Sequence, residues 1–197
     1  MEGELDVHID VWSDFVCPFC YIGKRRLERA LAHFPHREHV TVRFRSFELD
    51  PRASNEPAKP VLAVLARKYG LSPDEARRMT DGVARQGAAE GLVFRFETAV
   101  SANTFDAHRL FKYADARGLG GAVADKLFHA HFTASEHIGR RDTLLRLAAE
   151  VGLDREAVAQ VLHDATAFAA DVRADERRAQ ELGVRGVPFF LFNGKYT

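Results

Sequence analysis

The stretch SDFVCPFCYIGKRRLERAL, residues 13–31, holds both cysteines of the chain. Cys17 and Cys20 are three positions apart, with Pro18 between them. Apolar residues alternate with polar ones over 5–12, which predicts a strand that runs directly into this stretch. Proline suits the first position of a helix, because an N–H group there has no helical partner. The two thiols are therefore expected at a strand-to-helix junction.

The residues that follow this junction predict a second strand. The helix is expected to end near Pro35, and apolar residues again alternate with polar ones over 40–45. Two strands that are joined by a helical crossover are most often parallel. Residues 5–46 therefore predict a β-α-β unit.

The remaining sequence predicts a long helical block and then one returning strand. Residues 51–60 carry three prolines, which is typical of a linker. From there to about residue 182 the chain is predicted to be nearly all helical, with a short extended stretch at 94–96. Its signals include a capping box at Ser72 and helical patterns over 120–133, 143–151, 155–163 and 166–182. The apolar stretch VPFFLFNGK, residues 187–195, predicts a third strand, and the simplest arrangement pairs it with the first sheet.

Composition excludes several classes of function. The 197 residues are 46% hydrophobic, which is enough for one large domain or two small ones. The 28 basic and 28 acidic residues balance, so neither a nucleic acid nor a membrane is expected as a partner. No secretory signal and no apolar run of membrane-spanning length is visible. A cytoplasmic location is expected, where two cysteines seldom form a permanent structural bridge.

The position of the cysteine pair favours thiol–disulfide exchange. At a helix start, free N–H groups and the helix dipole stabilise a thiolate on Cys17, and the thiolate is the nucleophile. Cys20 lies one turn deeper, on the face assigned to the core, from which its sulfur can reach Cys17. The sequence therefore predicts an exposed attacking Cys17 and a buried resolving Cys20.

Two other interpretations of the pair stay open at this point. A zinc site needs two further ligands, and only histidines could supply them. The candidates are His33, His36, His39, His129 and His131. A pair of inert core cysteines is the second alternative. A helix start that directly follows a strand suits redox chemistry better, so no bound metal is expected.

The whole chain resembles the thioredoxin superfamily, and more closely the DsbA family in its FrnE-type branch. The matching segments are SDFVCPFCYIGKRRLE, NTFDAHRLF at 103–111 and LGVRGVPFFLFNGK at 182–195. The resemblance implies an α/β fold, a thioredoxin-like domain with a large all-helical insertion. Residues 1–50 and 166–197 are expected to form the thioredoxin-like domain, and residues 51–165 the insertion.

The resemblance also implies the residues of the site. Cys17 and Cys20 would be catalytic, and Pro188 would follow a cis bond in a loop that lies against Cys17. The backbone of Val187 would pair with an extended substrate segment. Together with these two, the expected substrate-binding residues are Pro18, Phe19 and Asn103. Asn103 also suits a plain helix cap, and His108 in the same segment is expected to be a helix-surface or packing residue.

The chain departs from the family pattern at three places. Phe19 stands where the best-known DsbA has a histidine, so a less acidic Cys17 and a weaker oxidant are expected. The nearest candidate for the buried acid of thioredoxins is Asp10, which is one residue out of register. The chain stops at Thr197, before the last strand and helix of a thioredoxin-like sheet. Either the natural chain continues, which is favoured, or a partner, such as a second copy in a homodimer, covers the exposed edge.

The leading hypothesis is a dithiol–disulfide oxidoreductase that acts on protein or small-thiol disulfides. It needs no cofactor, although glutathione could serve as a redox partner. The alternative is a glutathione-dependent isomerase or transferase of the kappa or chromene-carboxylate isomerase type, in which a serine stands at the position of Cys17. A redox-regulated binding protein without turnover is a third hypothesis.

Overall fold

A computed structural model describes residues 6–197, so the part of the first predicted strand at Leu5 lies outside the described residues. The sheet has the strand order β2-β1-β3. Strand β1 (Val7–Ser13) pairs in parallel with β2 (Val40–Ser46) and antiparallel with β3 (Phe189–Phe192). The predicted β-α-β unit and the return of the third strand to the first sheet are both confirmed.

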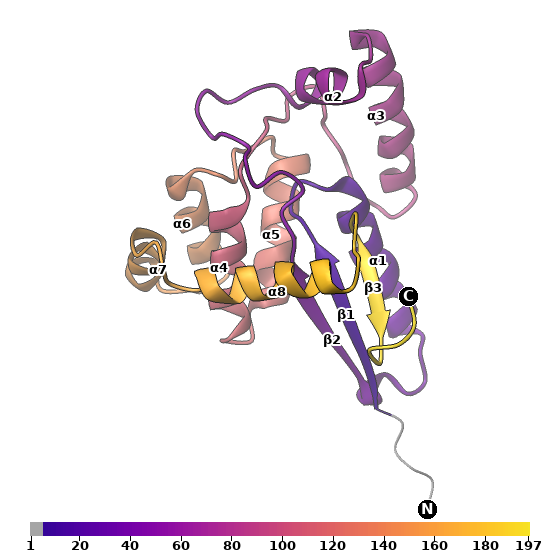
Figure 1. The fold of residues 1–197 in the computed structure, drawn as a ribbon, viewed down its shortest axis with the longest axis vertical. Helices are drawn as coiled ribbons and strands as arrows, with labels where there is room; N and C mark the ends of the chain where they lie inside the picture. The colour runs from indigo at the N-terminus through magenta and orange to yellow at the C-terminus, as the bar shows by residue number, and fades with distance from the viewer. Residues whose placement is uncertain (1–5) are drawn as a thin grey trace, which may run out of the picture.

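The crossover helix α1 (Pro18–Ala32) begins directly after Cys17 and ends before Pro35, as predicted. A short 3-10 helix (Arg37–His39) leads from it into β2. In Figure 1, α1 lies behind the sheet and α8 (Ala169–Glu181) crosses in front of it. The sheet is therefore covered on both faces, which explains why Val11 and Trp12, neighbours that point to opposite faces, are both buried.

Helices fill the chain between β2 and β3. Their bounds are α2 (Val61–Tyr69), α3 (Pro73–Ala88), α4 (Phe105–Asp115), α5 (Gly120–Phe132), α6 (Arg141–Glu150) and α7 (Arg155–His163). The capping box that was predicted at Ser72 is present at the start of α3. The stretch at 94–96 forms no strand, because Phe94 and Phe96 turn their rings into the core instead of pairing with a sheet.

The largest apolar core lies where α1 meets α4 and α5. Tyr21 of α1 stacks on Phe128 of α5, with 4.8 Å between the ring centroids. Phe15, in the loop before α1, packs against Phe111 and Phe128. The core therefore begins at the cysteine-bearing end of α1. A smaller cluster around Trp12 and Leu191 joins the sheet to α8.

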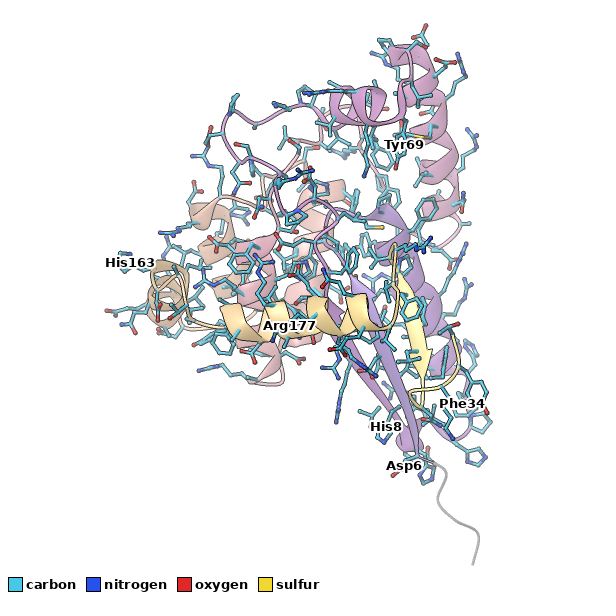
Figure 2. All side chains as sticks on the ribbon, in the orientation of Figure 1. Asp6, His8, Phe34, Tyr69, His163 and Arg177 are labelled. Carbon is cyan, nitrogen blue, oxygen red and sulfur yellow. The ribbon has the colours of Figure 1, made fainter. Side chains whose placement is uncertain are left out.

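Side chains fill the space between these helices and the sheet, whereas Tyr69, His163 and Arg177 point outward (Figure 2). The pair α2–α3 projects from the rest of the molecule (Figure 1), and α2 has no buried residue. Within residues 6–197, every helix is too short or too polar to cross a membrane.

Candidate active site

The two cysteines lie at the N-terminus of α1, where sequence reasoning placed them. Cys17 is the N-cap, and Pro18 occupies the first turn. The carbonyl of Cys17 accepts hydrogen bonds from the N–H groups of Cys20 and Tyr21, at 3.1 and 3.4 Å. Both thiols are free, so the structure shows the reduced site. The two residues are one helical turn apart in the chain, and their thiols are hydrogen-bonded.

The prediction that Cys17 is exposed is wrong. Its exposed fraction is 4%, which is close to the 2% of Cys20. The cause is the loop before β3, which returns 170 positions later in the chain. The Cys17 thiol donates to the carbonyl of Val187 in this loop at 3.4 Å. A helix start alone indicates an exposed thiol, and the covering loop reverses that expectation.

Electrostatics distinguish the two thiols although burial does not. The hydrogen bond from the Cys20 thiol is the largest cause that lowers the pKa of Cys17, and the backbone N–H groups of Cys20 and Phe19 act in the same direction. Burial and the charge of Asp14 oppose them, and the pKa of Cys17 is lowered overall. Burial is the main cause that raises the pKa of Cys20 well above its ordinary value. Cys17 is therefore the thiol that ionises first.

The bond between Val187 and Pro188 is cis, and the loop that carries it lies against the Cys17 sulfur, as predicted. The ring of Pro188 packs on α1 at Gly23, where an added Cβ would lie 3.2 Å from the proline Cγ. A larger residue at Gly23 would push the loop away from the thiol. Because Gly23 has no side chain, the loop has room to lie close to Cys17.

An open pocket of about 720 Å³ adjoins this loop. Its walls are mainly apolar and come from both α1 and the segment 187–192. They include Phe19, Gly23, Arg26, Val187, Pro188 and Phe190. Phe19 is 45% exposed, so its ring is accessible beside the buried sulfur. An accessible apolar surface therefore lies next to the loop that covers Cys17.

Asn103 ties loops together. Its side chain accepts from the N–H of Phe105 at 3.0 Å and donates to the carbonyl of Pro51 at 3.2 Å. Its backbone N–H donates to Asn55 at 2.7 Å. The N-cap of α4 is Thr104 and not Asn103, so Asn103 closes a turn one residue before the cap, and its role in substrate binding stays a prediction.

A buried carboxylate lies beside the cysteine pair, and it is Asp14. Asp10, the candidate from sequence, instead pairs with Arg45 on the sheet at 2.8 Å. Asp14 has no exposed surface, and its carbonyl accepts from the N–H of Cys17 at 3.1 Å. One carboxylate oxygen accepts from the N–H of Leu49 at 2.8 Å. The other lies 3.2 Å from Nε2 of His108, so His108 is a buried partner of Asp14 and not a surface residue.

Two more buried titratable groups surround this pair. Glu48, just after β2, accepts from Arg173 of α8 at 2.5 Å, and burial is the main cause that raises its pKa. His131 of α5 is fully buried, which lowers its pKa to about 4. The charge of Asp14 acts on His131 in the opposite direction.

Sequence reasoning missed Asp14 and Glu48. A signal existed for Asp14, because it is an acidic residue between an apolar strand and the cysteine motif. Glu48 follows β2 in the same way. Within residues 6–197, no three residues of metal-binding type gather closely enough to hold a metal ion.

Solved structures and a curated relative are similar to this chain over nearly its whole length. A probable DsbA oxidoreductase from Streptomyces coelicolor, SCO1869, has a crystal structure that matches with a TM-score of 0.91 and 44% sequence identity. That match covers 95% of this chain and 80% of the other. YwbO, an uncharacterized protein of Bacillus subtilis (strain 168), is 27% identical over 201 residues, which cover 95% of this chain and 87% of YwbO.

A more distant structure shows the same fold. The cytosolic disulfide reductase DsbM from Pseudomonas aeruginosa, solved with GSH, matches with a TM-score of 0.64 and 22% identity over 93% of this chain and 84% of DsbM. The family model of the DSBA-like thioredoxin domain matches residues 8–197, which is nearly the whole chain. The protein therefore belongs to the DSBA-like thioredoxin domain family.

Proposed function

We propose that the protein is a dithiol–disulfide oxidoreductase that exchanges disulfides with protein substrates through Cys17 and Cys20. The observation that carries the proposal is the geometry of the site: Cys17 is the N-cap of α1, Cys20 lies one turn deeper, and the loop with the cis bond before Pro188 contacts the Cys17 sulfur at 3.4 Å. The pKa of Cys17 is lowered and that of Cys20 is raised. An attacking thiol must ionise readily, and a resolving thiol must stay protonated until it is needed.

The exchange proceeds in two balanced steps. The Cys17 thiolate attacks one sulfur of a substrate disulfide, forms a mixed disulfide and releases the other substrate sulfur as a thiolate. Cys20 then passes its proton to the released thiolate or to water and attacks the Cys17 sulfur. This releases the second substrate thiolate and leaves a disulfide between Cys17 and Cys20. The same steps in reverse transfer that disulfide to a dithiol substrate.

The surroundings of Cys17 support an extended protein segment as substrate. The carbonyl of Val187 already contacts the Cys17 sulfur, and within residues 6–197 the strand that follows it pairs with one other strand only, β1. A backbone at this position can pair with an extended chain. The pocket beside Phe19 and Pro188 gives an apolar side chain of the substrate a place to bind. Pro18 and Asn103 complete the proposed substrate-binding set.

Three finer points belong to the same proposal. The chain is assigned to the FrnE-type branch because its cysteine motif and the segments at 103–111 and 182–195 resemble that branch. Its location is the cytoplasm, and glutathione is its small-thiol redox partner. We assign residues 1–50 and 166–197 to the thioredoxin-like domain and residues 51–165 to the insertion.

An insulin-reduction assay tests the proposal. The wild type with a thiol reductant should reduce insulin, and Cys17→Ser should lose at least about a thousandfold of that rate, because the nucleophile is gone. Cys20→Ala should accumulate mixed disulfides with substrate, because nothing resolves them. The trapped species would be identified by mass spectrometry of non-reduced protein.

The control is a surface variant far from the site, His163→Gln, which should keep the wild-type rate. A wild type that conjugates or isomerises a glutathione-dependent substrate and does not reduce insulin would contradict the proposal. That outcome would favour the glutathione-dependent isomerase or transferase. If the cysteine pair changes redox state but the protein turns over no disulfide substrate, the redox-regulated binding protein would be favoured.

A further inference from the structure

A buried polar contact joins the helical block to the residue beside the cysteine pair. His108 of α4 is 1% exposed, and Nε2 of its ring lies 3.2 Å from Oδ1 of Asp14. The ring packs against Phe15, with 4.8 Å between centroids, which fixes its orientation. Its other nitrogen, Nδ1, has no hydrogen-bond partner anywhere in residues 6–197. The polar contact of this ring is thus directed at Asp14.

Asp14 in turn contacts the reacting pair through its backbone. Its carbonyl accepts from the N–H of Cys17 at 3.1 Å, and its own N–H favours the thiolate of Cys20. Its carboxylate opposes the thiolate of Cys17 by charge repulsion. Because Asp14 is fully buried, water does not screen this repulsion as it would at the surface. The carboxylate of Asp14 therefore acts on the Cys17 sulfur, and its backbone N–H acts on the Cys20 sulfur.

Two N–H donors hold that carboxylate in place. The Leu49 N–H bonds one oxygen at 2.8 Å, and the imidazole of His108 bonds the other. Each donor offsets part of the negative charge on the oxygen that it contacts, and each fixes the carboxylate rotamer. The Leu49 donor belongs to the backbone, so His108 is the member of the pair that a substitution can remove.

The charged groups around His108 come from four elements. Asp14 faces it from the loop after β1, and Glu48 from the loop after β2. Arg173 and Glu176 of α8 both contact Glu48. His131 of α5 is near enough for the charge of Asp14 to act on it, and it is neutral near pH 7, because its pKa is about 4. On α4 itself, Arg109 and Lys112 pair with Asp106 and Asp175 instead.

We propose that His108 is a positioning residue of the thiol–disulfide site: its imidazole holds the buried carboxylate of Asp14, and through that carboxylate it stabilises the Cys17 thiolate. The proposal deepens the function proposed above and rests on it. It gives the helical block a part in the chemistry, because α4 supplies a contact that sets the reactivity of a thiol on α1.

A mutant cycle tests the proposal. In each variant the Cys17 thiolate is titrated with its ultraviolet absorbance as the signal, and the equilibrium of the cysteine pair with glutathione is measured. His108→Leu should raise the pKa of Cys17 by about half a unit to one unit and shift the equilibrium toward the disulfide. His108→Gln keeps an N–H donor and should restore most of the wild-type behaviour. Asp14→Asn should lower the pKa of Cys17, and His108→Leu should have little further effect in that background.

His131→Leu is the matched control, since it removes an equally buried histidine from α5 and should leave the Cys17 pKa unchanged. An unchanged Cys17 pKa in His108→Leu that folds, as judged by near-ultraviolet circular dichroism, would overturn the proposal. So would an equal shift with and without Asp14→Asn. If His108→Leu does not fold, Asp14→Asn decides, because an unaltered Cys17 pKa in that variant removes the link. If the wild type does not reduce insulin, the proposed function is refuted. The titrations of the Cys17 thiolate would still test the contact between His108 and Asp14.

Discussion

Two buried aspartates mark two regions of the molecule with different tasks. Asp175 of α8 faces the sheet at β2, is 5% exposed and is paired with two permanent cations, Arg45 and Lys112. Asp14 lies beside the cysteine pair and has no exposed surface. Within residues 6–197 its side-chain partners are an N–H group and a histidine, and no lysine or arginine pairs with it.

The difference follows from what each region must do. The Asp175 carboxylate also accepts from the N–H of Ser46 at 2.8 Å, and its carbonyl accepts from Trp12 at 2.9 Å. Lysine and arginine compensate this charge, so it joins α8 to the sheet, and Asp175 is not among the main causes that shift the pKa of either thiol. The charge of Asp14 has no lysine or arginine partner within residues 6–197, so it still acts on Cys17. A buried charge adds stability in one place and adjusts reactivity in the other.

The largest expected effect comes from removing the carboxylate of Asp175, the aspartate that joins α8 to the sheet. Asp175→Ala would leave Lys112 and the N–H of Ser46 without their buried partner, at a cost of about 3 to 4 kcal/mol of unfolding free energy. The Lys112 and Arg45 side chains are partly exposed, which keeps the cost below that of a fully buried pair. Urea denaturation followed by circular dichroism measures it.

The same variant sharpens the comparison through what it leaves unchanged. In Asp175→Ala that is still folded, the pKa of Cys17 and the equilibrium with glutathione should match those of the wild type. A redox shift as large as that of Asp14→Asn would show that the two regions are coupled and that the contrast between the two carboxylates is wrong.

The next effect concerns acid stability and the neighbour of Asp14, His131. Its pKa is lowered to about 4 in the folded state, from an ordinary value near 6.5. Below pH 6.5 the unfolded chain therefore binds a proton that the folded chain does not, so stability falls as the pH falls from 6.5 to 4. A shift of this size corresponds to about 3 kcal/mol lost across that window, with no further loss from this group below pH 4.

His131→Leu removes the titrating imidazole and places an apolar side chain at the same buried position. The unfolding free energy of wild type and variant would be measured by urea denaturation at several pH values from 4 to 7. The difference between the two proteins should change in favour of the variant as the pH falls. A constant difference across the window would mean that the buried histidine is not what makes the protein sensitive to acid.

The fold was predictable because its signals are local. The alternation over 5–12, Pro18 at a helix start and the capping box at Ser72 each depend on a few adjacent residues. The chemistry of the site depends on contacts between distant positions. Asp14 and His108 are 94 positions apart, and Val187 covers Cys17 from a distance of 170 positions. No pattern in the cysteine motif indicates that a histidine of the helical block faces the acid beside it.

The smallest expected effect concerns the residue between Pro18 and Cys20, where Phe19→His tests how far the exposed side of the site tunes the sulfur. The backbone N–H of Phe19 already lowers the pKa of Cys17, and its ring is 45% exposed. A histidine adds a polar donor close to the sulfur, which stabilises the thiolate and so favours the dithiol form. The change should be less than about one pKa unit, because an exposed donor acts against competing water.

Both quantities should move together, because one cause drives them: the pKa of Cys17 should fall and the equilibrium with glutathione should shift toward the dithiol. Phe19→Leu is the control, since it shortens the side chain without adding a donor and should leave both values near those of the wild type. If Phe19→His changes neither value while Asp14→Asn changes both, the redox poise is set from the buried side, through Asp14. If Phe19→His has the larger effect, the exposed turn of α1 dominates, and the buried carboxylate beside the pair is a lesser influence than its contacts indicate.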